Sequence, residues 1–230
     1  MAASERYRNE LKYLISYADY IALRQRLQLV MRRDRHADEQ GKYQIRSIYF
    51  GSPDDKALRE KIDGVDRREK FRIRYYNDDF SYISLEKKVK TGRRSMKLSA
   101  QLTEDECRKL LSGESEWMLN HPAELIQEFY VKMRYQLLRP CVLVSYLREA
   151  YVFAAGNVRI CFDSNISSTL FHQEFLEKTP VDICVQDDPG QMIYEVKYDD
   201  YLPELIASTI QTGTLRQQAF SKYAASRLFA

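Results

Sequence analysis

Charged side chains stand at every second position in several runs of this sequence, a spacing that could line a binding site for an anion. In the run KFRIRYY (70–76), Lys70, Arg72 and Arg74 share one parity, and aromatic or aliphatic residues occupy the other. Side chains on a β-strand point alternately to its two faces, so this run has one basic and one apolar face. The runs SYISLEKKVK (81–90) and SMKLSA (95–100) continue the pattern. What these residues can do depends on where their charged faces point.

Charged faces that point inward would create a strongly basic interior. Its residues are nine cations and three glutamates, namely Arg8, Lys12, Arg72, Arg74, Lys88, Lys97, Arg148, Arg159 and Lys197 with Glu10, Glu86 and Glu195. Burying isolated cations costs several kcal/mol each, and three carboxylates cannot neutralise nine cations. Such an interior must therefore stay wet and hold a polyanion. Arginine forks and lysine point charges both suit phosphate oxygens, so the expected ligand is a chain of phosphates.

The three glutamates suggest a metal site beside that ligand. Glu10, Glu86 and Glu195 each stand two residues before a lysine, which places carboxylate and ammonium on the same face of a strand. Carboxylates, phosphate oxygens and water form the hard-oxygen environment that Mg²⁺ or Mn²⁺ prefers. Such an ion could bridge phosphates and neutralise the charge that develops during phosphoryl transfer.

Strands of this kind recur along the whole chain and must position these residues. Further alternating runs are RYRNELKY (6–13), SYLREAY (145–151), VRICFD (158–163) and IYEVKYD (193–199), and residues 181–185 are predicted to pair with 192–198 across the turn at 188–190. About eight strands with interleaved helices predict an α+β fold, a closed eight-stranded antiparallel β-barrel with a polar, basic interior and surrounding helices. A β-sandwich would instead bury its apolar faces between two sheets. No linker interrupts the pattern, so residues 1–230 are predicted to form a single domain.

Composition limits the class of protein. The chain has 230 residues, 44% of them hydrophobic, which favours a globular protein. The four cysteines form no C-x-x-C pair, so neither a zinc site nor a disulfide framework is indicated. No apolar leader or membrane-length apolar run is evident, and we expect a reduced, cytoplasmic compartment.

The basic strands have two other interpretations. Amphipathic strands can simply face solvent, where mixtures of Lys, Arg and Glu are routine. A nucleic-acid-binding surface would need aromatic rings on the same face as the basic residues, whereas Phe71 and Tyr75 lie on the opposite parity to the arginines. The net charge is also only +3, so we expect no nucleic-acid partner.

An ordered set of motifs resembles a known family. The motifs are RYRNELKY, SIYFGSPD followed by KIDG, RxKFRIRYY, SLEKK followed by MKL, SYLREAY, VRICFD, IYEVKYD followed by LP, and FSKY. In this order they resemble the VTC domain, the catalytic domain of the vacuolar transporter chaperone polyphosphate polymerases, within the triphosphate tunnel metalloenzymes. The resemblance extends from Arg6 to Tyr223.

The resemblance implies an eight-stranded tunnel that transfers the γ-phosphate of ATP to a growing polyphosphate chain with a divalent metal, usually Mn²⁺. Tripolyphosphate and pyrophosphate are further ligands, and a membrane protein supplied by another chain is a possible partner. The implied catalytic, phosphate-binding set is Lys12, Arg72, Arg74, Lys88, Lys97, Arg148, Arg159 and Lys222, with Tyr146 as a hydroxyl donor to phosphate. Glu195 would be the principal metal ligand, with Glu86 and Glu10 as lesser candidates.

The sequence departs from the family at two places. Gly51 stands where an aspartate is usual, which concerns the start of the next helix rather than chemistry. The N-terminal motif is R-x-E-x-K and not the E-x-E-x-K of the CYTH branch, which argues against thiamine triphosphatase or adenylate cyclase chemistry. A triphosphatase that hydrolyses the same substrates, or a non-catalytic polyphosphate-binding module, remains an alternative to the polymerase.

Overall fold

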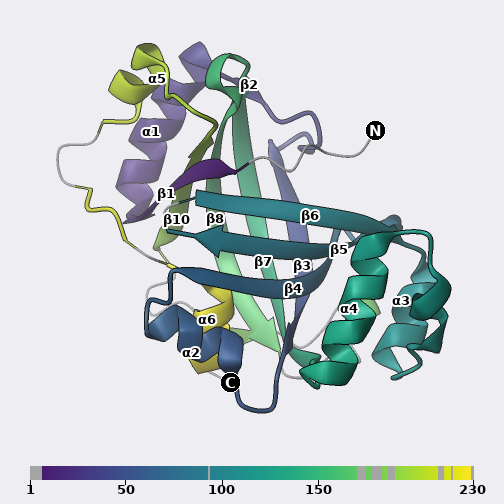
Figure 1. The fold of residues 1–230 in the computed structure, drawn as a ribbon. Coiled ribbons are helices and arrows are strands. Elements are labelled where there is room, and N and C mark those ends of the chain that lie inside the picture. Colours follow the sequence, from purple (N-terminus) through teal and green to yellow (C-terminus); the bar gives the residue numbers. More distant parts are fainter. Residues whose placement is uncertain are drawn as a thin grey trace.

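The computed structural model describes residues 7–92, 94–169, 175–177, 183–185, 190–211, 215–218 and 220–228. Eight antiparallel strands within these ranges form a closed ring. Their order is β7-β3-β4-β5-β6-β1-β10-β8, and the pairing of β7 with β8 closes it. The predicted closed ring of eight antiparallel strands, with helices around it, is confirmed (Figure 1).

The strand bounds agree with the alternating runs of the sequence. The ring consists of β1 (Arg8–Ile15), β3 (Lys42–Gly51), β4 (Arg67–Tyr76), β5 (Asp79–Thr91), β6 (Arg94–Leu102), β7 (Arg139–Phe153), β8 (Val158–Thr169) and β10 (Met192–Tyr198). Two-residue strands, β2 (Arg32–Arg33) and β9 (Ile183–Cys184), extend the sheet beside β7 and β8.

One predicted pairing is wrong. Ile183 and Cys184 pair with β8, not with β10 as the hairpin prediction required. The two edges of β10 are already occupied by β1 and β8, which leaves no edge for a hairpin partner. Residues 181–182 of the predicted strand and 188–189 of the predicted turn lie outside the described residues.

Helices surround the ring. The α-helices are α1 (Tyr17–Val30), α2 (Lys56–Ile62), α3 (Glu104–Leu111), α4 (Glu124–Tyr135), α5 (Glu204–Thr209) and α6 (Lys222–Leu228), with 3₁₀ turns η1 (Glu116–Asn120) and η2 (Ala155–Asn157). Capping boxes start two of them: Ser16 with Asp19 at α1, and Thr103 with Glu106 at α3. No helix in the described ranges is long and apolar enough to cross a membrane.

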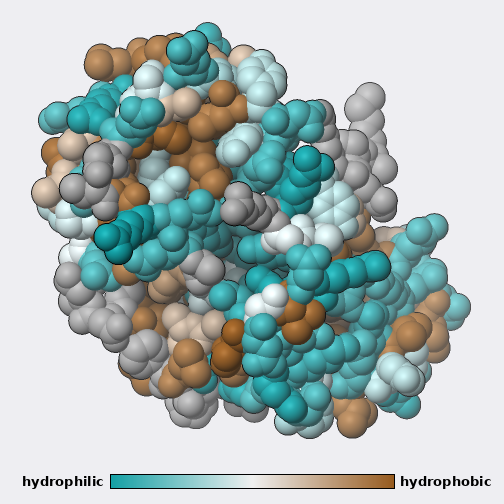
Figure 2. All heavy atoms as spheres, turned by 60° about the vertical axis from the view of Figure 1, so that its left-hand side comes forward, coloured by the Kyte–Doolittle hydropathy of each residue, from teal (hydrophilic) through white to brown (hydrophobic). Residues whose placement is uncertain are grey.

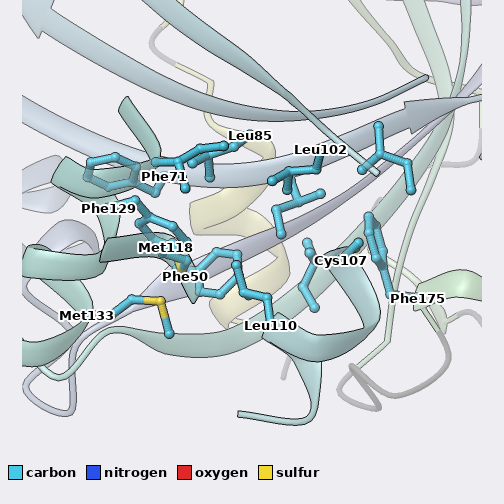
Figure 3. Packing of buried hydrophobic residues seen from close by; sticks show 14 of the residues in the cluster. Phe50, Phe71, Leu85, Leu102, Cys107, Leu110, Met118, Phe129, Met133 and Phe175 are labelled. Atoms are coloured by element: carbon cyan, nitrogen blue, oxygen red, sulfur yellow. The ribbon is translucent and has the colours of Figure 1, made fainter. Parts of the chain in front are cut away.

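Apolar faces of the strands point outward, against helices that include α1, α3 and α4. Phe71, the apolar neighbour of Arg72 on β4, stacks on Phe129 of α4 with ring centroids 4.9 Å apart. Figure 3 shows both rings within a cluster that also holds Leu85 and Leu102 from β5 and β6. A second cluster packs α1 against the outer faces of β8 and β10. Burial of these outward faces leaves the charged faces of the same strands inside the ring.

The interior of the ring is not polar throughout. A third apolar cluster, which includes Tyr43, Ile45, Val142 and Val144, is built from the inward parity of β3 and β7. It fills part of the space that the ring encloses. The charged residues gather in the remaining part, which is where a ligand has room.

Candidate functional site

A cavity of about 760 Å³ opens among the inward-facing charged residues. Twelve of the residues predicted from the sequence line it: Arg8, Glu10, Lys12, Arg72, Arg74, Lys88, Lys97, Tyr146, Arg148, Glu195, Lys197 and Lys222. Figure 2 shows hydrophilic residues predominating across the middle of one face of the molecule. The structure therefore brings residues from both halves of the chain to one cavity.

The cavity is strongly basic. Among its described lining residues, thirteen are Lys or Arg and four are Asp or Glu. An excess of this size in a partly enclosed space is stable only with water and counter-anions. The cavity is therefore suited to a ligand that carries several negative charges.

Arg72 lies in an ionic network with Glu86 and Lys97. Arg72 and Glu86 are direct partners across β4 and β5, and Arg72 Nε donates to Glu86 Oε2 at 2.7 Å. Lys97 Nζ donates to the other carboxylate oxygen of Glu86 at 2.9 Å. Burial opposes ionisation of Glu86, but Arg72, Arg74 and Lys97 hold the pKa of its carboxyl well below the usual range. Glu86 is not among the residues that line the cavity, and it orients Arg72 and Lys97, which do.

Arg148 is fixed by an aspartate that was not among the predicted site residues. Its Nε and Nη2 donate to the two oxygens of Asp163 at 2.6 and 2.8 Å, across the β7–β8 pairing. Lys222 of α6 donates to the same carboxylate at 2.5 Å. Asp163 is fully buried, and although burial opposes ionisation, Arg148 and Lys222 lower its pKa to about 2. One ionised carboxylate thus positions two cations of the cavity.

Glu10 and Glu195 lie together on β1 and β10. Lys12 is 3.4 Å from Glu10 and 3.5 Å from Glu195, and Lys197 lies 3.3 Å from Glu195. The two carboxylates share both lysines, because Lys197 also lies 3.8 Å from Glu10. Burial works against ionisation of Glu195, but Lys12 and Lys197 hold its pKa well below the usual value. A pair of carboxylates therefore faces the cavity.

This pair suits a divalent cation better than the three predicted glutamates as one set. Within the described ranges no group of three or more His, Cys, Asp or Glu side chains could hold a metal ion. Mg²⁺ commonly binds one or two protein carboxylates and completes its coordination with substrate phosphates and water. Glu10 and Glu195 line the cavity and match that requirement, whereas Glu86 is not among the residues that line it.

Among the described residues, the hydroxyl of Tyr146 accepts one hydrogen bond and donates none. Arg74 Nη2 donates to Tyr146 Oη at 2.9 Å, and Lys222 Nζ lies 4.5 Å from the centre of its ring. The phenol oxygen is thus used as an acceptor, and its hydrogen remains to be donated.

Neither Arg159, which was a predicted site residue, nor Arg46 lines the cavity. Arg159 is not among the residues that line the cavity: its Nη2 lies 2.5 Å from Asp34 and 2.6 Å from the hydroxyl of Tyr43. Its role as a phosphate ligand stays a prediction. Arg46 lies on the outward parity of β3, where it donates to Tyr75 at 2.7 Å.

The sequence offered a signal for some of the residues that the prediction missed. Asp163 shares its parity with Arg159 in VRICFD, and Lys70 shares its parity with Arg72 in KFRIRYY. Tyr49 accepts a hydrogen bond from Arg72 at 3.0 Å, but its parity in QIRSIYF holds no charged residue that would have marked it. Lys61 on α2 also lines the cavity, but nothing in its local sequence sets it apart from a solvated helix lysine.

Comparison with known proteins gives one family and several structures of the same fold. The VTC domain family model matches residues 7–229. None of the curated proteins matches the sequence. A candidate adenylate cyclase from Vibrio parahaemolyticus has a TM-score of 0.53 at 11% identity, covering 99% of this chain and 100% of its own.

Two further structures resemble the chain at a similar level. A candidate adenylate cyclase from Bacillus halodurans has a TM-score of 0.50 at 15% identity, covering 85% of this chain and 82% of its own. A candidate adenylyl cyclase from Hippeastrum, described as having a dominant triphosphatase activity, has a TM-score of 0.50 at 12% identity, covering 96% of both chains. Likeness at these identities shows a shared fold.

Proposed function

The chain belongs to the VTC domain family, and on that premise we propose that it is a metal-dependent polyphosphate polymerase. It binds the phosphates of ATP in the basic cavity and transfers the γ-phosphoryl group to the end of a polyphosphate chain. The observation that supports this best is the cavity itself, where thirteen basic residues surround a pair of carboxylates.

The basic residues bind and orient the phosphates. The bidentate bond to Asp163 occupies Nε and Nη2 of Arg148, which leaves the Nη1 donor for a phosphate oxygen. Arg72 is oriented in the same way by Glu86. Because their carboxylate partners already fix these two arginines, they lose little further conformational entropy when the ligand binds. Their charges stabilise the phosphoryl group during its transfer. Tyr146 adds a neutral donor between Arg74 and Lys222.

Glu195 and Glu10 would hold the divalent cation. When bound, Mn²⁺ or Mg²⁺ supplies positive charge that neutralises phosphate oxygens as the phosphoryl group moves. The protein contributes the two carboxylates and the lysines that keep them ionised. No covalent intermediate on the protein is required, because an acceptor phosphate can displace the leaving diphosphate directly.

The same site becomes a triphosphatase if water replaces the acceptor phosphate. Incubation of the protein with ATP and Mn²⁺ separates the two reactions. A polymerase forms ADP and long-chain polyphosphate, which is resolved by gel electrophoresis. A triphosphatase forms free phosphate without polymer. Unchanged ATP would contradict both and would leave a binding module as the remaining function.

Arg72→Ala is expected to weaken binding of tripolyphosphate about 10- to 100-fold, because one charged hydrogen bond contributes about 1.5–3 kcal/mol. Titration calorimetry measures the change. Arg108→Ala is the matched control, since Arg108 lies on α3 in an exposed pair with Glu104 and does not line the cavity. Equal affinities of wild type and Arg72→Ala would show that Arg72 does not contact phosphate.

A further inference from the structure

Lys222 reaches the cavity from a helix and not from a strand of the ring. It is the first residue of α6, and its Nζ donates to Asp163 at 2.5 Å. Arg72 and Arg148, which also line the cavity, stand on strands whose backbones are paired on both sides. Strand pairing does not fix Lys222, so its place in the cavity depends on how α6 is held against the rest of the chain.

An ion pair joins the last turn of α6 to the start of α2. Arg227 Nη2 donates to the two carboxylate oxygens of Asp55 at 2.8 and 2.9 Å. Asp55 is the N-cap residue of α2, with φ at 51°, and its backbone N–H donates to the carbonyl of Ser52. The two helices lie beside each other in Figure 1. Arg227 is therefore bound to a fixed point on another helix.

The orientation of α6 depends on a small number of contacts. Within the described ranges two ion pairs join it to other elements, one at each end: the pair of Lys222 with Asp163 and the pair of Arg227 with Asp55. Between them the ring of Tyr223 packs on a tyrosine of β3, with centroids 5.3 Å apart. A helix of seven residues is not stable by itself in water. The contacts at its ends therefore decide how it lies.

The pair of Arg227 with Asp55 can direct α6 without contributing much to the stability of the whole fold. The two side chains are 23% and 35% exposed, and neither lines the cavity. Ion pairs with this exposure typically add little to folding stability. A short helix can shift or fray at low cost, however, so a weak contact is enough to bias its position. Misplacement of a functional group by about 1 Å can cost up to about a hundredfold in its effect.

We propose that Asp55 and Arg227 are positioning residues, which hold α6 so that Lys222 reaches a phosphate of the bound ligand. This inference rests on the proposed function, because it takes phosphate as the ligand of Lys222. Neither Asp55 nor Arg227 contacts the ligand, and both act through Lys222. Their effect on phosphate binding therefore requires Lys222, whereas residues that only stabilise the fold would affect binding with or without it.

A double-mutant cycle tests the proposal, with tripolyphosphate as the probe and titration calorimetry as the measurement. We expect Lys222→Ala to weaken binding about 10- to 100-fold, and Arg227→Gln to weaken it about three- to tenfold. In the Lys222→Ala background, Arg227→Gln should change the affinity less than about twofold, because the group that it positions is gone. Arg108→Gln is the matched control, since Arg108 forms an exposed ion pair on α3, and it should leave the affinity unchanged in both backgrounds.

Two further variants keep the test independent of folding. Asp55→Asn removes the charge and keeps a residue type that tolerates positive φ, so it should weaken binding as much as Arg227→Gln does. Arg227→Lys keeps the charge and should retain most of the wild-type affinity. Thermal unfolding is measured for every variant. Losses of affinity that follow the unfolding temperature, and not the charge at these two positions, would overturn the positioning role.

The outcomes separate this inference from the proposed function. Equal losses for Arg227→Gln with and without Lys222 would overturn the positioning role while the proposed function stands. An unchanged affinity in Arg227→Gln or in Lys222→Ala would overturn it as well. A wild-type protein that shows the expected coupling with tripolyphosphate, but leaves ATP unchanged in the presence of Mn²⁺, would contradict the proposed enzyme and leave the positioning of Lys222 intact.

Discussion

Glu195→Gln is expected to lower ATP turnover by at least about a hundredfold, because loss of a group that stabilises transition-state charge typically costs that much or more. Glutamine keeps the size of the side chain and removes its negative charge. Glu195 is 4% exposed and lies 3.5 Å from both Lys12 and Arg148. The substitution therefore changes the charge of the site while its surroundings stay closely packed.

Binding and turnover should respond in opposite directions. In the absence of metal, Glu195 repels the negative charge of a phosphate chain, so Glu195→Gln should bind tripolyphosphate as tightly as wild type or more tightly. Titration without metal measures the binding, and release of ADP in the presence of Mn²⁺ measures the turnover. Glu104→Gln, on the exposed face of α3, is the matched control. A role in charge balance alone would give tighter binding with turnover retained, and that result would exclude Glu195 as a metal ligand.

Glu10→Gln tests the second carboxylate of the proposed metal site. Glu10 contacts Lys88 at 2.9 Å and Lys12 at 3.4 Å, so it shares a cation with Glu195. The family resemblance gives Glu10 the lesser role, and we expect a smaller loss of turnover than for Glu195→Gln. A larger loss would reverse the order of the two carboxylates in the metal site.

Strand parity was sufficient to predict most of the cavity. On β4 the sequence separates Arg72 and Arg74 from Phe71, and the structure places the two sets on opposite faces of the ring wall. The reason is local: Phe71 is covered by Phe129 of α4, so the alternate positions of the same strand face inward. An unbroken alternation of charged and apolar residues is therefore enough to predict which side chains face the cavity.

Parity could not identify the partners of each charge. Arg159 has the predicted inward parity, but Asp34, which precedes it by more than a hundred residues, binds its guanidinium. The sequence argument counted only glutamates against the cations, whereas Asp163 and Asp199 also form ion pairs in and around the cavity. Lys222 was predicted only from the family resemblance, because α6 reaches the cavity through a segment without strand periodicity. These ion pairs join segments that are far apart in the sequence. They form only when the ring of strands closes, and local alternation of residues does not predict them.

Asp163→Asn is expected to reduce the free energy of unfolding by about 3–5 kcal/mol, the usual cost of breaking a buried ion pair from one side. Asp163 is fully buried and contacts two cations, Arg148 and Lys222. An asparagine leaves both cations in the ring without their carboxylate. Urea denaturation at pH 7 measures the loss. The exposed pair of Glu104 and Arg108 gives the control, since Glu104→Gln should cost no more than about 0.5 kcal/mol.

The pH dependence of unfolding should identify the same group. The pKa of Asp163 is lowered to about 2 in the folded chain, against about 3.9 in an unfolded one. A carboxyl with a lowered pKa stabilises the fold when ionised, so its contribution is complete above about pH 4 and is lost as the pH falls toward 2. Wild type should lose on the order of 2 kcal/mol through this group over that range. Asp163→Asn should lack that component of the acid transition.

The loss in Asp163→Asn should be partly restored by the ligand, because a phosphate chain can supply the negative charge that the substitution removes. Anything that binds only the folded state stabilises it by mass action. With Arg148 and Lys222 released from Asp163, tripolyphosphate should raise the unfolding temperature of the variant more than that of wild type. Chloride at the same ionic strength is the control for screening. A smaller ligand effect in the variant would mean that Asp163 is needed to hold the two cations in position, so that orientation and not charge alone determines how this cavity binds phosphate.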